Sequence, residues 1–194
     1  DAMVRQRRAV GMRGGGVRAA GRMGKAGCDA IAATDDCEVV AAVDPDRGGE
    51  QVAGTGVVVA TDASAFLDAG VEVSVACTVL DAARENLRWC AAHDVHAVVG
   101  TTGFSTDDLD EYAELFSHSA ANGLIAANFA IGAVLMMRFA EMAAPWFEPE
   151  EIIDIHHDQK IAAPQGTAMP TARRMAAASP GQPVDPATRL VRDG

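Results

Sequence analysis

The residues of this chain with the clearest capacity for proton transfer are His156, His157 and Lys160, which lie within five positions of one another. Imidazole titrates near neutral pH and can donate a proton to a reacting group. A cationic cluster in an acidic chain also suits a dianionic substrate. A little further along, Gly166 and Thr167 open an expected helix, whose N-terminal N–H groups can bind a carboxylate.

Two other interpretations of the histidine cluster remain open. One is a two-histidine metal site, which adjacent residues of a strand disfavour because their side chains point to opposite faces. The other is a solvated surface loop, since most loops lie at the surface. We therefore predict a substrate site that holds no metal.

A glycine-rich segment, Gly21-Arg22-Met23-Gly24, precedes an expected helix that begins near Lys25. Glycines allow a backbone to approach a pyrophosphate closely, and the helix N-terminus offers N–H donors to it. A dinucleotide-binding motif also needs a preceding strand, and between residues 14 and 20 only Val17 is strand-like. An ordinary turn into a helix is therefore an equal alternative for this segment.

Two further segments directly follow expected strands. Asp44 ends a β-branched run about 20 residues beyond the glycines, where a carboxylate can accept ribose hydroxyls and repel a 2′-phosphate. Since Pro45 follows it, Asp44 also suits a turn. The segment from Gly100 to Phe104 ends another run, and Thr101 and Thr102 within it can hydrogen-bond a ligand. Without this location, the segment would be interpreted as a turn.

The elements that position these segments are apolar β-branched runs alternating with helical patterns, as is typical of a parallel sheet with crossover helices. We expect strands at Glu38–Val43, Val57–Ala60, Val71–Cys77, His96–Val99 and Leu124–Ala127. We expect helices at Arg22–Ala33, Asp81–His93 and Thr106–Ser117. The fold class is therefore α/β, with a Rossmann-like, doubly wound parallel sheet that binds ligands at the carboxyl ends of its strands.

The pattern changes after Asn128. A long apolar helix is expected over residues 130–147, a strand at Glu151–His156, and a helix from about Thr167 to Ala178. We place a dinucleotide-binding domain at residues 1–129 and a smaller α+β substrate domain at residues 130–194. The second domain offers one clear strand for a layer that needs several, so we expect it to be incomplete at its C-terminus.

The composition excludes several classes of protein. The chain has 194 residues, of which 49% are hydrophobic, and is too apolar to be disordered. Its net charge of −11 argues against nucleic-acid binding, although residues 1–25 hold seven basic side chains and one acidic one. No apolar run approaches the roughly 20 residues that span a bilayer. Four widely spaced cysteines argue against a zinc site and a disulfide framework, and favour the cytoplasm.

Three groups of residues together resemble one known family. They are His156-His157-x-x-Lys160-x-x-Ala163-Pro164-x-Gly166-Thr167, the segment from Gly100 to Phe104, and Ala126-Ala127-Asn128-Phe129. From about Gly21 to about Ala178 the chain resembles 4-hydroxy-tetrahydrodipicolinate reductase (dihydrodipicolinate reductase) of the lysine and diaminopimelate pathway. The resemblance implies an oxidoreductase that reduces this small-molecule dicarboxylate, via dihydrodipicolinate, to tetrahydrodipicolinate with NADH or NADPH. It also implies a homotetramer built by the smaller domain.

The resemblance assigns roles to individual residues. His156 matches the proton donor and Lys160 the residue that polarises the substrate, so both are expected to be catalytic. His157 also holds the substrate, and Gly166 with Thr167 matches the cradle for its carboxylate. The pyrophosphate loop falls at Arg18 to Met23, which includes Gly21, Arg22 and Met23, and the ribose-binding acid at Asp44. The expected nicotinamide contacts are Gly100, Thr101, Thr102, Ala126, Ala127, Asn128 and Phe129.

The chain departs from the family pattern at several positions. Arg18 replaces the first glycine of the motif and would crowd its tight turn, and the N-terminal strand is lost in an Arg/Gly stretch. Ala76-Cys77-Thr78 stands where Asp-Phe-Thr is usual, and Ala162 and Gln165 replace an Asp and a Ser. The chain starts at Asp1 rather than Met and stops at Gly194, before the family's later strands. We therefore expect a fragment that binds cofactor weakly and catalyses little.

Two alternative functions remain at this stage. One is a noncatalytic dinucleotide-binding remnant of the family, which the missing C-terminal sheet and Arg18 favour. The other is a different Rossmann oxidoreductase, which the double-histidine motif disfavours.

Overall fold

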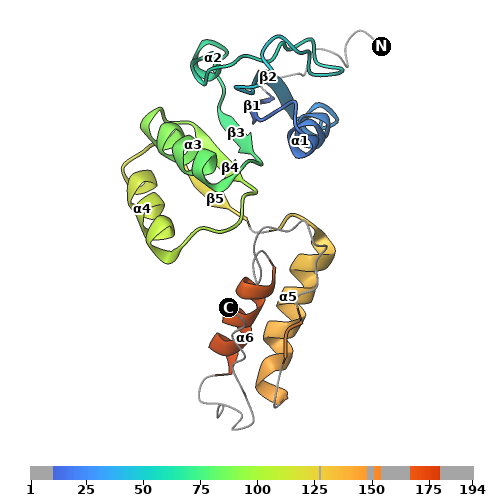
Figure 1. The fold of residues 1–194 in the computed structure, drawn as a ribbon, viewed down its shortest axis with the longest axis vertical. Coiled ribbons are helices and arrows are strands. Elements are labelled where there is room, and N and C mark those ends of the chain that lie inside the picture. Colours follow the sequence, from blue (N-terminus) through green and yellow to red (C-terminus); the bar gives the residue numbers. More distant parts are fainter. Residues whose placement is uncertain (1–10, 127, 148–150, 154–166, 180–194) are drawn as a thin grey trace, which may run out of the picture. The chain divides into compact units, whose positions relative to one another are not determined.

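The computed structural model describes residues 11–126, 128–147, 151–153 and 167–179. The chain divides into two compact units, Asp1–Ala126 and Ala127–Gly194. The first unit contains a parallel sheet of five strands in the order β2-β1-β3-β4-β5, with helices between successive strands (Figure 1). The α/β fold class with a parallel sheet is therefore confirmed.

The strands are β1 (Met12–Val17), β2 (Cys37–Val43), β3 (Val73–Ala76), β4 (His96–Val99) and β5 (Gly123–Ile125). The helices of the same unit are α1 (Arg22–Ala32), α2 (Ser64–Asp68), α3 (Leu80–Ala92) and α4 (Thr106–Ser117). Helices α1, α3 and α4 confirm the three helices expected from the apolar period, with bounds that differ by one residue at most. The short helix α2 was not expected.

The expectation that the N-terminal strand is lost is wrong. Strand β1 pairs with β2 on one side and with β3 on the other, so it lies inside the sheet. The register joins Val17 to both Val43 and Ala76. Glycine has a low strand propensity, which hides this strand in the sequence, but packing in the folded state overrides that propensity.

Two glycines of β1 lie where the sheet leaves no room for a side chain. A Cβ atom on Gly15 would lie 2.9 Å from atoms of both Phe66 and Val71. A Cβ atom on Gly16 would lie 2.8 Å from Sγ of Cys28. These distances are well below van der Waals contact at about 3.5–4.0 Å. The glycines therefore allow elements on both faces of the sheet to approach its central backbone.

The strand expected at residues 57–60 is not continuous, and that prediction is wrong, but the position of the segment is informative. Val43 and Ala60 form an isolated parallel bridge. The Ala60 carbonyl accepts the Asp44 N–H at 2.9 Å, and the Ala60 N–H donates to the Ala42 carbonyl at 2.8 Å. The segment therefore lies beside the outer edge of β2, where a Rossmann sheet has its third strand.

The remaining strand predictions are confirmed with shifted ends. Strand β4 has the expected bounds, and β2 begins one residue earlier than expected. Strand β3 is shorter than expected at both ends. Strand β5 ends at Ile125, so Ala126 lies beyond it, and Ala127 lies outside the described residues.

The two faces of the sheet carry separate cores. Gly16 of β1 faces Cys28 of α1, whereas the neighbouring Gly15 faces Phe66 of α2, because successive residues of a strand point to opposite faces. On the second face Phe66 packs edge-on against Trp89 of α3, with ring centroids 6.1 Å apart. Side chains from α3 and α4 complete this core.

The described part of the second unit is helical. It contains α5 (Ile131–Ala143), the 3-10 turn η2 (Ala144–Trp146) and α6 (Ala168–Ala178), which confirms the last expected helix. The helix expected over residues 130–147 is shorter, because Pro145 has no N–H and its ring clashes with the preceding helical turn. Of the strand expected at 151–156, residues 151–153 form no strand and residues 154–156 lie outside the described residues. Within the described ranges, no helix is long and apolar enough to cross a membrane.

Candidate functional site

The five parallel strands end in one row, because the register makes the last residues of adjacent strands neighbours. The residues that follow this row are Arg18, Asp44, Cys77, Gly100 and Ala126. Asp44, Gly100 and Ala126 are expected cofactor contacts, and the structure brings all three to one edge of the sheet.

The strand order reverses between β1 and β3, since the chain passes from β1 to β2 and then returns to the other side of β1. In doubly wound sheets, ligands bind in the crevice at the carboxyl ends of the strands where the order reverses. Thr78 lies two residues after the end of β3, one of the two strands at this reversal, and its Oγ1 is buried without a hydrogen-bond partner among the described residues. A buried hydroxyl without a partner fits a ligand that can hydrogen-bond there. In the sequence, Thr78 follows Ala76 and Cys77, which depart from the family pattern, and no local signal marks it as a site residue.

The turn between β1 and α1 depends on its glycines. Arg18 lies in the left-handed region with a φ of 50°, and its carbonyl accepts the Gly21 N–H at 2.9 Å. A Cβ atom on Gly24 would collide with that same carbonyl oxygen, so this position requires glycine. Gly21 is the N-cap of α1, and no side chain caps this helix end. The helix begins with Arg22 and the exposed Met23, and its first-turn N–H groups suit an anion such as a pyrophosphate.

Asp44 is almost completely buried, at 3% exposure, directly after β2. Its Oδ1 accepts the Asp46 N–H at 3.2 Å, and its backbone carbonyl accepts the Arg47 N–H at 3.2 Å. Asp44 therefore does organise a turn, which was one of its two interpretations. The turn leaves the ribose-binding interpretation open, because a carboxylate can accept several hydrogen bonds through its two oxygens.

An ion pair that the sequence analysis missed joins the loops after β1 and β2. Nη2 of Arg18 lies 2.8 Å from Oδ2 of Asp46. Arg47 also reaches toward β1, since its Nη1 donates to the Ala20 carbonyl at 2.7 Å. Two guanidinium groups therefore connect the loops around Asp44. The sequence signal that could have revealed this ion pair is a basic residue, Arg18, and an acidic residue, Asp46, that each follow one of two adjacent strands.

The segment after β4 is fixed to the segment after β3. The Thr101 side chain is buried, and its hydroxyl donates to the Thr78 carbonyl at 2.8 Å and accepts the Thr78 N–H at 3.3 Å. Thr101 thus connects the two loops through the hydroxyl that was expected to face a ligand. Thr102 follows in a half-buried position, and Gly103 adopts a φ of 101°, which favours glycine.

Two expected site residues are in contact within the second unit. Nδ2 of Asn128 donates to Oγ1 of Thr167 at 3.0 Å, although the two residues are 39 positions apart. Oδ1 of Asn128 also accepts the Ala130 N–H at 2.8 Å, which fixes the orientation of the amide. Phe129 is 52% exposed. Asn128, which is expected to contact the nicotinamide, therefore hydrogen-bonds the hydroxyl of Thr167, which is expected to bind the substrate carboxylate.

The other predicted site residues lie outside the described residues, and their roles stay predictions. They are His156, His157, Lys160, Gly166 and Ala127. Within the described ranges, no group of three or more His, Cys, Asp or Glu side chains is arranged to hold a metal ion.

Comparison with known proteins identifies the family. The family model of the dihydrodipicolinate reductase N-terminus matches residues 16–129, and that of the C-terminus matches residues 132–191. The chain belongs to the dihydrodipicolinate reductase family. The resemblance drawn from the sequence is thereby confirmed, and a different Rossmann oxidoreductase is excluded.

Individual members of the reductase family are similar to most of this chain. The 4-hydroxy-tetrahydrodipicolinate reductase of Cutibacterium acnes is 45% identical over 161 residues, which cover 82% of this chain and 59% of that relative. The reductase of Nocardia farcinica is 45% identical over 168 residues, which cover 86% and 62%. The chain therefore spans less than two thirds of the length of these relatives. A dipicolinate-bound dihydrodipicolinate reductase from Paenisporosarcina sp. TG-14 has a TM-score of 0.73 at 31% identity, with 95% of this chain and 73% of that chain covered.

Proposed function

We propose that this member of the family reduces 4-hydroxy-tetrahydrodipicolinate, via dihydrodipicolinate, to tetrahydrodipicolinate with NADH or NADPH in lysine and diaminopimelate biosynthesis. The observation that carries the proposal is the ordered match of both family models along one chain. The row of expected cofactor residues at one sheet edge supports it. The alternative of a noncatalytic remnant is not favoured, because the chain matches both family models and is 45% identical to the reductases of Cutibacterium acnes and Nocardia farcinica.

The cofactor side of the site is supported by the described residues. The first turn of α1 after Gly21 would bind the pyrophosphate, and Asp44 would accept the ribose hydroxyls. The segment from Gly100 to Thr102, with Ala126 to Phe129, would contact the nicotinamide. The unpartnered Oγ1 of Thr78 offers one further hydrogen bond at the crevice. Reduced nicotinamide bound there would supply a hydride to the conjugated ring of the substrate.

The chemistry on the substrate side is assigned to residues of the family motif. Addition of a hydride to a conjugated imine leaves negative charge on the substrate, which the Lys160 ammonium would balance. His156 would donate the proton that the ring carbon takes up. His157 would hold the substrate, and Gly166 with Thr167 would bind one carboxylate. Asn128 orients the Thr167 hydroxyl for this task through the hydrogen bond at 3.0 Å.

We further propose a homotetramer in the cytoplasm, with residues 1–129 as the cofactor domain and residues 130–194 as the substrate and assembly domain. Helix α5 carries large apolar side chains at the surface, since Ile131 is 77% exposed and Phe139 and Met142 are each 61% exposed. Exposed apolar surface of this size marks interaction sites. The four cysteines are unpaired, which fits a reducing compartment. Sedimentation velocity should give the mass of a tetramer.

The proposed activity is tested by oxidation of NADH and NADPH in the presence of freshly generated dihydrodipicolinate. Replacement of His156 by Ala should lower kcat by about 100-fold or more, the range for loss of a positioned general acid. Lys160→Ala should both raise KM and lower kcat, because this charge acts in the ground state and in the transition state. His118→Ala is the matched control, since His118 is exposed and pairs with Glu114 at 2.8 Å. Turnover that neither His156→Ala nor Lys160→Ala affects would refute the assignment.

A further inference from the structure

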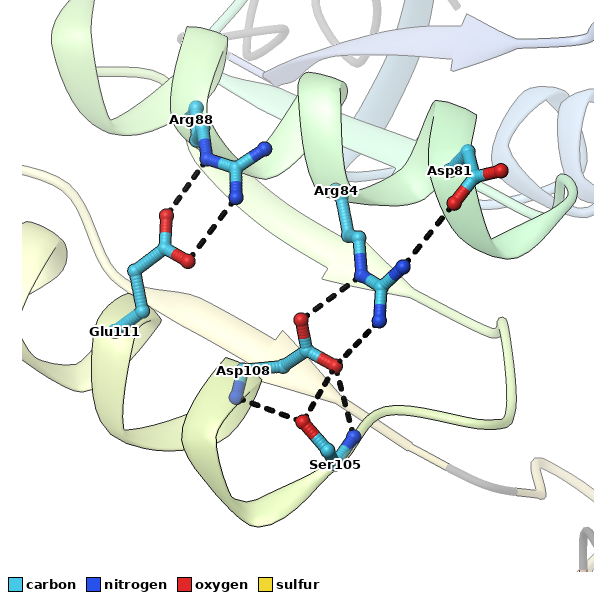
Figure 2. A network of polar contacts seen from close by, with 6 residues as sticks. All are labelled: Asp81, Arg84, Arg88, Ser105, Asp108 and Glu111. Atoms are coloured by element: carbon cyan, nitrogen blue, oxygen red, sulfur yellow. Dashed lines mark hydrogen bonds and ion pairs between the residues drawn. The ribbon is translucent and has the colours of Figure 1, made fainter.

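A polar network joins the first two turns of α3 to the first turn of α4 (Figure 2). Nε and Nη2 of Arg84 donate to the two carboxylate oxygens of Asp108, each at 2.8 Å. Nη1 of Arg84 donates to Oδ1 of Asp81 in its own helix at 3.1 Å. The Asp108 side chain is 10% exposed and that of Arg84 31% exposed. A bidentate ion pair of this kind fixes both side chains more strongly than a single hydrogen bond does.

Asp108 hydrogen-bonds both Arg84 and the backbone of Ser105. Oδ2 of Asp108 accepts the Ser105 N–H at 2.8 Å and the Ser105 hydroxyl at 2.9 Å. The Ser105 Oγ in turn accepts the Asp108 N–H at 3.1 Å, which completes a capping box at the start of α4. Ser105 directly follows the segment from Gly100 to Phe104. Arg84 therefore binds the same carboxylate that caps the start of α4 next to that segment.

The same segment is held at its other end by a different contact. Thr101 binds the backbone of Thr78 through its hydroxyl. Thr78 precedes α3 by two residues, and Arg84 lies in the second turn of that helix. The segments after β3 and β4 are therefore connected at two places. Thr101 binds Thr78 near the strand ends, and Arg84 of α3 binds Asp108 of α4. Between these fixed ends lie Thr102 and the left-handed Gly103.

Electrostatics keeps the network ionised. The hydrogen bonds from Arg84 and from the Ser105 backbone hold the pKa of the Asp108 carboxyl far below its usual range. The same pair raises the pKa of Arg84. Both partners thus carry full charge at neutral pH.

We propose that Arg84 is a positioning residue for cofactor binding, which acts through Asp108 and Ser105 to fix the loop from Gly100 to Phe104 in the shape that receives the nicotinamide. This inference rests on the proposed function. Arg84 itself lies in α3 and contacts Asp108 of α4. A loop that is ordered before binding avoids the cost of ordering it at that moment, which appears as affinity for the cofactor.

The protein contains a matched control for this network. Arg88 and Glu111 form a second two-pronged pair between the same helices, with contacts of 2.6 and 3.0 Å (Figure 2). Arg88 is one turn further along α3 than Arg84, and Glu111 is three residues beyond Asp108. Neither partner bonds to Ser105 among the contacts of the described residues. Loss of this pair therefore leaves the Ser105 cap intact. Arg88 reaches the loop only indirectly, because it lies 5.9 Å from the centroid of the Tyr112 ring, which packs edge-on against Phe104.

The test compares Arg84→Gln, Arg84→Lys and Arg88→Gln with the wild-type chain. Hydrogen–deuterium exchange without cofactor should speed up over residues 100–105 in Arg84→Gln and stay at the wild-type rate there in Arg88→Gln. The dissociation constant for NADH, from fluorescence titration, should rise about tenfold in Arg84→Gln, the effect expected when one or two side chains must be ordered on binding. Arg84→Lys keeps the charge without the two-pronged geometry, so both effects should be intermediate. Urea midpoints should fall by similar small amounts in Arg84→Gln and Arg88→Gln.

The outcomes separate the inference from the proposed function. Equal exchange rates over residues 100–105 in Arg84→Gln and Arg88→Gln would overturn the inference, and so would faster exchange without weaker NADH binding. If Arg84→Gln fails to fold, Arg84→Lys decides by the same two measurements. A wild-type chain that binds neither NADH nor NADPH, but whose loop exchange still depends on Arg84, would overturn the proposed function and support only the structural half of the inference.

Discussion

Because β1 lies inside the sheet, a methyl group added to one of its glycines is expected to lower the stability of the fold. In Gly15→Ala the new Cβ would lie 2.9 Å from both Phe66 and Val71, about 0.6 Å or more inside normal contact. Both neighbours are buried, at 2% and 7% exposure, so they cannot move into solvent. Overpacking at such a site costs about 1–3 kcal/mol, and the lower entropy of the unfolded chain offsets about 0.4–1 kcal/mol of that. The expected net loss of stability is about 1–2 kcal/mol.

Urea unfolding followed by circular dichroism measures this loss, which should lower the midpoint by about 0.5–1 M. Gly14→Ala is the matched control one residue earlier in the same strand. There the new Cβ would meet the methyl groups of Ile31 at 3.4 Å, the edge of ordinary contact. This variant should keep the wild-type stability or gain up to about 1 kcal/mol. Equal midpoints for Gly15→Ala and Gly14→Ala would show that β1 is not packed between two layers.

Three further outcomes follow from the loops and from the helix network. Asp44→Ala should weaken NADH binding about tenfold or more while NADPH binding changes less, because the carboxylate hydrogen-bonds free ribose hydroxyls but repels a 2′-phosphate. Titration of both cofactors measures this effect, and an unchanged ratio of the two dissociation constants would contradict it. Arg18→Gly should stabilise the chain by about 1 kcal/mol, since relief of left-handed strain outweighs an exposed ion pair, and a lower urea midpoint would contradict this. Because the pKa of Asp108 is lowered in the folded state, the stability that it contributes is complete above the ordinary pKa of an aspartate and is lost as the pH falls below it. The stability difference between wild type and Asp108→Asn should therefore shrink between about pH 6 and about pH 3, and a constant difference would refute the ionised pair.

Elements that are specified by neighbouring residues could be predicted from the sequence, whereas those that depend on distant residues could not. The apolar period sufficed for α1, α3 and α4, because a helix that packs on a sheet repeats its buried positions every three to four residues. The loop residues Asp44 and Gly100 were found because each directly follows a β-branched run. Strand β1 was missed because its need for glycine comes from side chains such as Phe66, which lies about 50 residues away in the chain. No local pattern contains that information.

The polar contacts at the sheet edge were missed for a related reason. The pair of Arg18 and Asp46 and the bond from Thr101 to Thr78 each join loops that become neighbours only through strand order. Each residue taken alone has an ordinary surface composition. Their partners could be identified once β1 was known to adjoin β2, and β3 to adjoin β4.

These contacts also favour one point of the sheet edge for the proposed cofactor site. The loops after β1 and β2 are connected by Arg18 and Asp46, and those after β3 and β4 by Thr101 and Thr78. Within residues 11–126, no hydrogen bond or ion pair connects the loop after β1 to the loop after β3. The strand order reverses between those two strands, and doubly wound sheets bind ligands at such a point. The buried, unpartnered Oγ1 of Thr78 belongs to one of these two loops, which is the arrangement expected of a cofactor site whose two sides are each preorganised.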